Sequence, residues 1–333
     1  MIDYSLKNGH VHAGLPVEVG HNSGHFWFPS LHTVGENTLV CAVIRSADVA
    51  QGKWPAELFI SEDSSASWRF DQAIESYGHA SVVQEGEGTL MMPYELWPFG
   101  PDDRVNGSAP GTVLTRTKPG SLAADNREIC FCGFPAPLAI YHENELWLHH
   151  NGNIVSLPGG QRFTTLYGRF EGDSHYSCFA AVSDDDGVTW TYRGTVANGS
   201  AVPGAPEGPN ESSTQLLDNG DLLCVYRVSG EWDFRKSYSS DAGKTWSQPI
   251  LMQGMWSVQP RLIRLPNGAL FLTGGRPGLF CWLCTDGHGD TWDRINLGKH
   301  HNECVAGATK RFSDAFCNAE KGEDVALSTS YTG

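Results

Sequence analysis

Residues 210–227 read NESSTQLLDNGDLLCVYR, and this stretch decides the fold. Two apolar segments flank a turn at 218–221, which consists of residue types that favour tight turns between strands. Antiparallel pairing would fold the second segment back along the first, so Arg227 would return beside Glu211. One face of this unit is therefore expected to carry a carboxylate next to a guanidinium.

The same unit recurs along the chain. The copies occupy residues 29–45, 80–95, 136–151, 212–227 and 260–276, with a weaker sixth copy at 314–331. Five of them share a leucine at one register: Leu39, Leu90, Leu146, Leu222 and Leu270. Each copy is a short apolar strand, a turn with Gly, Asn or Asp, and a second strand. This pattern predicts a β-hairpin in every copy.

A second repeat follows the first. Residues 183–190 (SDDDGVTW) and 239–246 (SSDAGKTW) fit S-x-D-x-G-x-T-W, and residues 61–68 fit it loosely. Residues 285–292 (TDGHGDTW) keep the Gly-x-Thr-Trp end but have the Asp displaced by one position. We expect a hairpin turn in which Ser and Asp bond the backbone, Gly takes a positive φ and Trp packs between strands.

Together the two repeats give four strands per unit. They predict an all-β fold for residues 1–333: a single domain that is a six-bladed β-propeller with four-stranded antiparallel blades. The last blade is either completed by residues 2–14 or incomplete. Residues 101–126 are rich in Gly, Pro, Ser and Asp, and we expect them to form an exposed excursion over one face.

Composition excludes several classes of function. The formal net charge of -15 argues against binding nucleic acid or an anionic membrane surface. No run of about 18 apolar residues exists, so no membrane span is expected. The start resembles no signal peptide, which predicts a cytoplasmic protein, or a secreted one if the N-terminus is incomplete.

The nine cysteines are an odd number, and most lie within apolar segments. They are interpreted as reduced core thiols. Cys281 and Cys284 form a CxxC pair, but in a strand these two side chains point to opposite faces. No metal and no cofactor are therefore predicted.

The four turns resemble the Asp-box turns of the sialidase (neuraminidase) superfamily, and the resemblance covers nearly the whole chain. Sialidases hydrolyse terminal sialic acids with retention. They use a tyrosine nucleophile assisted by a glutamate, an aspartate as acid/base, and three arginines that bind the sugar carboxylate. The resemblance implies that Glu211 is this glutamate and Arg227 the second arginine. It also implies Asp48, which follows Arg45, as acid/base and Tyr331 in STSYTG as nucleophile.

The chain departs from the family pattern at two of the three arginines. The first arginine of the family lies in a Phe/Tyr-Arg-Ile-Pro motif, whereas residues 26–29 read FWFP, with Trp27 in its place. Arg276 in GGRPG is the best placed for the third arginine, without matching closely. A site with one or two arginines is expected to bind a different acidic sugar or a neutral one.

The register of the repeat predicts a site independently, because the first strand of each propeller blade lines the central channel. The positions before the copies are Phe28, His79, Pro135, Glu211 and Gln259. The second strands end near the same mouth at Arg45, Glu95, Asn151, Arg227, Arg276 and Tyr331. One mouth of the channel is therefore expected to form a polar-sugar pocket, since burying such charges unpaired would be costly. Its expected residues are Trp27, Arg45, Asp48, His79, Glu95, His150, Glu211, Arg227, Arg276 and Tyr331.

We assign three catalytic candidates, Asp48, Glu211 and Tyr331. The substrate-binding candidates are Trp27, Arg45, His79, Glu95, Arg227 and Arg276. Structural alternatives stay open for them: an ion pair between strands for Glu211 and Arg227, solvent-facing charges for Arg45 and Asp48, a turn for Arg276, a core aromatic for Tyr331, and strand histidines for His79 and His150.

The leading hypothesis is an exo-acting glycoside hydrolase that removes a terminal acidic sugar from a glycan. Glu211 would take the proton of Tyr331, and Asp48 would act as acid/base. A second hypothesis is a non-catalytic carbohydrate-binding propeller, supported by Trp27. A third is a uronide lyase that uses a tyrosine with His79 or His150 and an arginine on the uronate.

Overall fold

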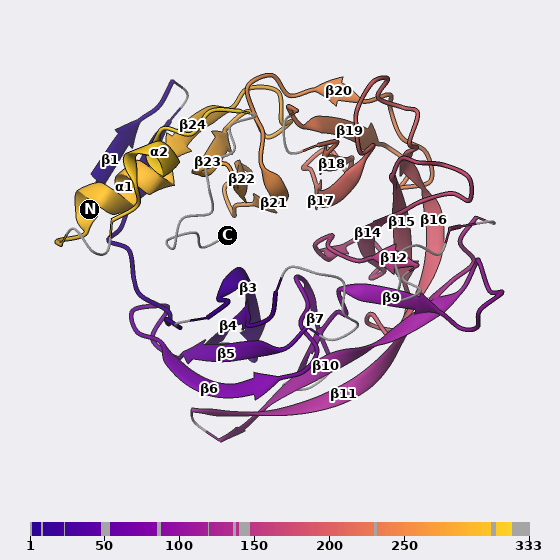
Figure 1. The fold of residues 1–333 in the computed structure, drawn as a ribbon, viewed down its shortest axis with the longest axis horizontal. Helices are drawn as coiled ribbons and strands as arrows, with labels where there is room; N and C mark the ends of the chain where they lie inside the picture. The colour runs from indigo at the N-terminus through magenta and orange to yellow at the C-terminus, as the bar shows by residue number, and fades with distance from the viewer. Residues whose placement is uncertain are drawn as a thin grey trace.

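The computed structural model describes residues 2–7, 9–22, 24–47, 54–84, 88–118, 120–135, 138–139, 147–229, 232–307 and 311–321. Asp48 and Tyr331 lie outside these ranges. The described chain is almost entirely β-structure, and its sheets stand in a ring around a common axis (Figure 1). This arrangement is that of a propeller-like fold.

Three sheets have four antiparallel strands in chain order, as predicted for propeller blades. The first consists of β3 (Trp27–Val34), β4 (Thr38–Ile44), β5 (Ala56–Ser61) and β6 (Arg69–Ile74). The second consists of β17 (Asn210–Leu216), β18 (Leu222–Arg227), β19 (Arg235–Ser239) and β20 (Ile250–Leu251). The third consists of β21 (Val258–Arg264), β22 (Leu270–Gly275), β23 (Leu279–Cys284) and β24 (Asp293–Asn296).

A ten-stranded sheet contains two further sets of four antiparallel strands, β7-β8-β10-β11 and β12-β14-β15-β16. They are joined because β9 pairs with both β10 and β12, and because β11 runs parallel to β16. Its strands are β7 (Ser81–Val83), β8 (Gly88–Met91), β9 (Glu95–Pro98), β10 (Gly107–Lys118), β11 (Ser121–Cys132), β12 (Leu148–His149), β13 (Val155–Ser156), β14 (Arg162–Gly168), β15 (Ser177–Ser183) and β16 (Thr189–Ala197). Two sets of strands that were expected as separate blades are therefore hydrogen-bonded to each other.

The expectation of an exposed excursion at residues 101–126 is wrong. Most of this segment belongs to the long hairpin of β10 and β11, and β10 also pairs with β8 on its other side. Its glycines allow neighbouring strands to approach closely. A Cβ atom at Gly107 would lie 2.2 Å from the carbonyl oxygen of Trp97, and a Cβ atom at Gly111 would lie 2.7 Å from the carbonyl oxygen of Met91. Pairing on both sides thus overrides a loop-like composition.

The hydrophobic core lies between neighbouring sets of strands. One cluster joins strands β3–β5 to the β8–β11 region, and includes Ile44, Leu58 and Leu114. Three further clusters repeat this arrangement around the ring. Between β11 and β16, the rings of Phe131 and Trp190 stack at a centroid distance of 6.0 Å. Each sheet therefore depends on its neighbours for burial of its apolar faces.

The repeated turns have the expected geometry. In residues 239–246, Asp241 Oδ1 accepts hydrogen bonds from the backbone N–H groups of Lys244 and Thr245, and the Trp246 indole donates to the Gly243 carbonyl. Gly243 has a φ of 86°. The same pattern of bonds recurs in residues 183–190.

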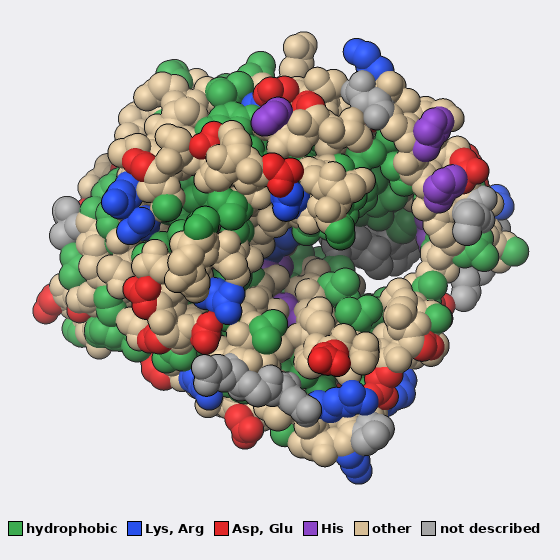
Figure 2. All heavy atoms as spheres, turned by 180° about the vertical axis from the view of Figure 1, so that it is seen from behind, with side chains coloured by type: hydrophobic (Ala, Val, Ile, Leu, Met, Phe, Trp, Pro, Cys, Tyr) green, Lys and Arg blue, Asp and Glu red, His purple; other side chains and the backbone are tan. Residues whose placement is uncertain are grey.

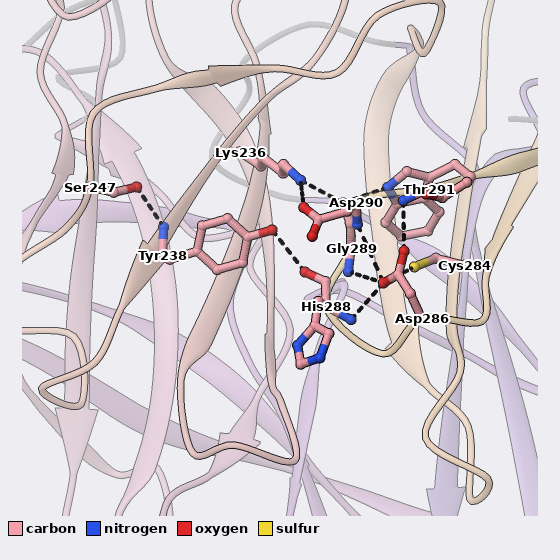
Figure 3. A network of polar contacts seen from close by, with 10 residues as sticks. Lys236, Tyr238, Ser247, Cys284, Asp286, His288, Gly289, Asp290 and Thr291 are labelled. Carbon is pink, nitrogen blue, oxygen red and sulfur yellow. Dashed lines mark hydrogen bonds and ion pairs between the residues drawn. The ribbon is translucent and has the colours of Figure 1, made fainter.

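The turn at residues 285–292 keeps the pattern despite its displaced Asp (Figure 3). Asp286 accepts from the backbone N–H groups of Gly289 and Thr291, and the Cys284 thiol donates to it at 2.9 Å, where the other turns use Ser. Lys236 of β19 reaches this turn and donates to Gly289 O at 2.6 Å and to Asp290 at 2.9 Å. The turn therefore also joins two neighbouring sheets.

The two ends of the described chain lie together (Figure 1). β1 (Ile2–Ser5) and β2 (His10–Ala13) form a separate two-stranded sheet. They contact helix α1 (Leu297–Cys304), where His300 bonds Tyr4 and the Gly14 carbonyl. Helix α2 (Asp314–Cys317) begins the sixth repeat copy, so the strand expected there is wrong. The rest of that copy lies outside the described residues, and the number of blades stays a prediction.

Candidate functional site

The site begins with a bulge that repeats in three sheets. Phe28, Glu211 and Gln259 occupy the same register position in β3, β17 and β21, and they have φ values of 48°, 40° and 46°. The strand pairing shifts register at each of these positions. Non-glycine residues reach this conformation only at a cost of about 1–2 kcal/mol. A bulge redirects its side chain, and here all three side chains line one pocket.

This pocket, called the first pocket below, brings together residues that are far apart in the sequence. Its lining consists of Phe28, Ile44, Trp54, His79, Tyr94, Glu211, Val258, Gln259 and Arg276. Four of the five positions before the repeat copies are among these residues. The fifth, Pro135, is not.

Glu211 is held by two groups from neighbouring strands. Arg227 Nη1 lies 2.8 Å from Glu211 Oε2, and the backbone N–H of Gln259 donates to the same oxygen at 2.9 Å. Burial alone would raise the pKa of the Glu211 carboxyl, but Arg227, the Gln259 N–H and the charge of Arg276 outweigh it and lower this pKa. Glu211 is therefore a carboxylate at neutral pH.

Arg227 has a second carboxylate partner, Glu207, at 2.8 Å from Nη2. Burial alone would lower the pKa of the guanidinium, but Glu211 and Glu207 raise it. Two of its nitrogens are thus occupied by protein carboxylates. This geometry makes Arg227 a residue that orients Glu211, and it leaves Arg276 as the arginine that lines the first pocket.

His79 lies on the pocket wall, where its ring contacts those of Tyr77 and Tyr94. The Tyr77 hydroxyl contacts the Phe28 carbonyl at 2.5 Å and His79 Nδ1 at 2.8 Å. Because this hydroxyl has one proton and a carbonyl can only accept, Nδ1 of His79 donates and Nε2 is the unprotonated nitrogen. Burial, followed by the charge of Arg261, holds the pKa of His79 well below its ordinary value. The imidazole is therefore neutral.

Arg261, in β21, is a site residue that sequence reasoning missed. Its Nη1 donates to the Asn151 carbonyl, and its buried Nη2 has no hydrogen-bond partner within the described ranges. Burial together with Arg261 lowers the pKa of His32 to about 4 and that of His150 to about 3. Figure 2, which shows the molecule from behind, has a central hollow in which Lys or Arg and His side chains are visible below the surface.

The sequence held a signal for Arg261. Arg261 is the second residue of the copy at 260–276. The corresponding residues of four other copies are uncharged: Ser30, Ser81, Pro137 and Ser213. Ser30 and Ser81 bond the His32 ring at 2.8 and 3.0 Å. At this register the charge of Arg261 adds to the effect of burial in lowering the pKa of His32.

Besides Arg227, three described candidates do not line the first pocket. The Trp27 indole donates to the Ser46 carbonyl at 2.9 Å. Arg45 forms an ion pair with Glu57 at 2.9 Å. Glu95, only 3% exposed, lines a neighbouring cavity. Their assigned substrate contacts stay predictions, as do the roles of Asp48 and Tyr331.

His150 is fully buried and bonds Thr164 Oγ1 at 2.8 Å, apart from the lining of the first pocket. Within the described ranges, no three His, Cys, Asp or Glu side chains are grouped so that they could hold a metal ion. All nine cysteines are free thiols. No helix in the described part of the chain is long and apolar enough to cross a membrane.

Comparison with known structures finds this fold in a protein of unknown function, a sialidase and an arabinanase. A protein of unknown function from Dyadobacter fermentans is 20% identical with a TM-score of 0.61, over 84% of this chain and 85% of that chain. The Hadza microbial sialidase Hz136 is 14% identical with a TM-score of 0.59, over 82% of this chain and 58% of that chain. An α-L-arabinanase from Penicillium chrysogenum, complexed with arabinobiose, is 14% identical with a TM-score of 0.52, over 84% and 83%.

The sequence matches no protein-family model and no curated protein. At identities of 20% or less, the structural similarity concerns the fold and not the activity. The chain therefore has the propeller-like fold that sialidases and this arabinanase share.

Proposed function

We propose that the chain is an exo-acting glycoside hydrolase that removes a terminal acidic sugar, sialic acid or a related one, from a glycan. The observation that carries this proposal is Glu211, a carboxylate at the wall of a central pocket, oriented by Arg227 and by the Gln259 N–H. Arg276 lines the same pocket. A cation and an oriented base in one pocket suit an anionic sugar.

In this mechanism, Glu211 takes a proton from the nucleophile. Its lowered pKa keeps it ionised, which a general base requires. We assign the nucleophile to Tyr331 and the acid/base to Asp48 from the resemblance to sialidases. A neutral phenol suits an anionic substrate, because a carboxylate nucleophile would be repelled by the sugar carboxylate. Arg276 would bind that carboxylate.

The test is hydrolysis of a panel of fluorogenic glycosides by the wild type, Glu211→Gln and Glu207→Gln. The two variants are matched, because both glutamates pair with Arg227 at 2.8 Å but only Glu211 lines the pocket. We expect release from an acidic glycoside, a loss of about 100-fold or more in Glu211→Gln, and a much smaller loss in Glu207→Gln. Equal activity of Glu211→Gln and wild type would refute the assignment.

A second candidate, a uronide lyase, is favoured by the tautomer of His79. A neutral imidazole with an unprotonated Nε2 at a pocket wall can act as the base that removes a proton beside a uronate carboxyl. The test is the ultraviolet absorbance of a new carbon–carbon double bond, in the wild type, His79→Gln and the control His149→Gln. If the wild type and His149→Gln produce this absorbance and His79→Gln does not, the lyase would replace the hydrolase as the proposed function.

The third possibility, a non-catalytic carbohydrate-binding propeller, is an outcome of the same panel. A folded protein that binds an acidic sugar saturably and cleaves none of the glycosides, by hydrolysis or elimination, would be a binding protein. In that case Glu211 and Arg227 would orient pocket groups without taking a proton.

A further inference from the structure

The hairpin of β1 and β2 carries two histidines on one exposed face. His10 and His12 are two residues apart in β2, and alternate side chains of a strand point to the same face. Both histidines are exposed, whereas Val11 between them is partly buried. In Figure 2, His side chains lie next to an acidic side chain at the edge of the molecule that holds this hairpin. The two imidazoles are therefore surface neighbours whose Cα atoms lie about 6.5–7 Å apart.

Each histidine faces a polar partner on β1. The strand register places His12 opposite Asp3 and His10 opposite Ser5. His12 Nδ1 lies 2.5 Å from Asp3 Oδ1, and His10 Nδ1 lies 3.4 Å from Ser5 Oγ. Because the Asp3 carboxylate accepts this bond, His12 Nδ1 donates it, and in the neutral ring Nε2 carries the lone pair. Asp3 therefore selects the tautomer in which Nε2 of His12 can bind a metal ion.

The Nε2 atoms of the two rings are available as ligands. Neither has a hydrogen-bond partner among the described residues. Bonds of about 2.0–2.1 Å to one Zn²⁺ ion would bring these two nitrogens to about 3.3 Å from each other. Imidazoles on neighbouring positions of one strand face reach this separation by rotation of their side chains. His10 and His12 can therefore chelate one ion from the strand conformation that they already have.

The inner face of the hairpin keeps this arrangement in place. The Tyr4 hydroxyl lies 3.1 Å from His300 Nδ1, and His300 Nε2 donates to the Gly14 carbonyl at 2.8 Å. An isolated two-stranded hairpin is marginal in water, whereas this one is attached to helix α1 by Tyr4 of β1 and by Gly14, which follows β2. The strand that carries the two histidines is therefore ordered before an ion binds, which favours binding.

We propose that His10 and His12 bind a divalent transition-metal ion of the class that imidazole prefers, such as Zn²⁺, through their Nε2 atoms. Asp3 is the positioning residue, since a carboxylate commonly holds the second nitrogen of a ligand histidine. The described part of the chain has no group of three His, Cys, Asp or Glu side chains that could hold a metal ion. The proposed site accordingly has two protein ligands, and the other coordination positions of the ion are open to water. None of its residues lines the first pocket, so its test does not depend on the proposed hydrolase.

The test is titration of Zn²⁺ into the untagged protein at neutral pH, followed by isothermal calorimetry. The wild type should bind one ion per chain with a micromolar Kd. In His12→Gln the Kd should rise by about 100-fold or more, because one imidazole remains and the chelate is lost. Asp3→Ala keeps both imidazoles but removes the group that orients His12, so the Kd should rise by about 10-fold.

His21→Gln is the matched control. His21 is also exposed and its Nδ1 also lies near a carboxylate, at 3.1 Å from Glu18 Oε1, but it has no histidine two residues away. The Kd of this variant should equal that of the wild type, because a single oriented imidazole does not form a chelate.

A second measurement identifies the rings that bind the ion. The Hε1 signals of His10 and His12 are assigned in the proton NMR spectrum by their absence in His10→Gln and His12→Gln, and the same spectra show whether these variants are folded. Both signals should shift as Zn²⁺ is added to the wild type. No binding of Zn²⁺ by the folded wild type, or an equal Kd in the wild type and His12→Gln, would overturn the proposal. An unchanged Kd in Asp3→Ala would overturn the role of Asp3.

Discussion

At the scale of single residues, the contacts of Glu211 explain why it stays in a left-handed conformation. Its φ of 40° is costly, but the Arg227 guanidinium and the Gln259 N–H both bond its side chain there. Strain of this kind persists only where the surroundings fix the residue. The strained conformation directs the carboxylate into the first pocket.

Replacing Arg227 tests this account of Glu211. Arg227→Met leaves Glu211, whose side chain is 12% exposed, without its counter-charge. We expect the free energy of unfolding to fall by about 3 kcal/mol, because a largely buried carboxylate remains unpaired. Urea unfolding at pH 7 measures this loss. The double variant Arg227→Met/Glu211→Gln should recover part of it, and a single-variant loss near zero would contradict the pairing.

His32 predicts a dependence of stability on pH. Burial lowers its folded pKa to about 4, whereas the unfolded pKa is about 6.5. The unfolded chain therefore binds the proton first, and stability that is fully present above pH 6.5 is lost as pH falls towards 4. For His32 alone this loss is on the order of 3 kcal/mol.

Urea unfolding at pH 7 and pH 5 checks this dependence. In His32→Gln, the difference in unfolding free energy between the two pH values should shrink. In the control His10→Gln, which changes an exposed histidine, it should match the wild type. If His32→Gln kept the full difference, His32 would not be a source of acid sensitivity.

Part of the site could be predicted from the sequence. The repeat register was enough to place His79, Glu211 and Arg276 in one pocket, because residues at one register of a repeat meet around the axis. The directions in which the Trp27 and Arg45 side chains point were not predictable, because they depend on contacts with Ser46 and Glu57. Arg261 carries a charge at a register where serine is otherwise common, and this exception was overlooked.

At the scale of elements, the repeated turns are stabilised by one aspartate each. In residues 239–246, Asp241 accepts from the backbone of Lys244 and Thr245 and from the Thr245 hydroxyl. Its lowered pKa, about 2, follows from the hydrogen bonds of Thr245 first. The carboxylate therefore organises the turn that connects β19 to β20.

Asp241→Ala is expected to lower the free energy of unfolding by about 1–2 kcal/mol, because several hydrogen bonds in the turn lose their acceptor. The control is Asp184→Ala, at an exposed position of the corresponding turn where the side chain bonds only Gln161 among the described residues. The control should change stability by less than about 0.5 kcal/mol. Equal losses in thermal or urea unfolding would contradict the structural role of Asp241.

The elements differed in how well the sequence predicted them. The hairpins in residues 29–45, 212–227 and 260–276 were predicted correctly, since turn chemistry and apolar strands are local signals. Most of the copy at 136–151 lies outside the described residues. The β10–β11 hairpin was mistaken for a loop, because its Gly and Pro content hides strands that are paired on both sides. Helix α2 was mistaken for a strand, although Ser313 caps its start by accepting from the Phe316 N–H.

At the scale of the whole molecule, the ring of sheets creates the site. Glu211 and Gln259 come from adjacent sheets, whereas Phe28 of β3 and His79, which precedes β7, come from far earlier in the sequence. The hydrophobic clusters between neighbouring sheets fix their relative positions. The repeat predicted this all-β arrangement, but not the joining of two sets of strands through β9, which is a tertiary contact without a local signal.

The central claim is that Glu211 is the base of a glycosidase acting on an acidic sugar. The most direct measurement is kcat/KM of the wild type, Glu211→Gln and Glu207→Gln on a fluorogenic sialoside and on neutral and uronic glycosides. The account predicts release from an acidic glycoside, with a loss of about 100-fold or more in Glu211→Gln alone. No release by the folded wild type from any glycoside, or full activity in Glu211→Gln, would contradict it.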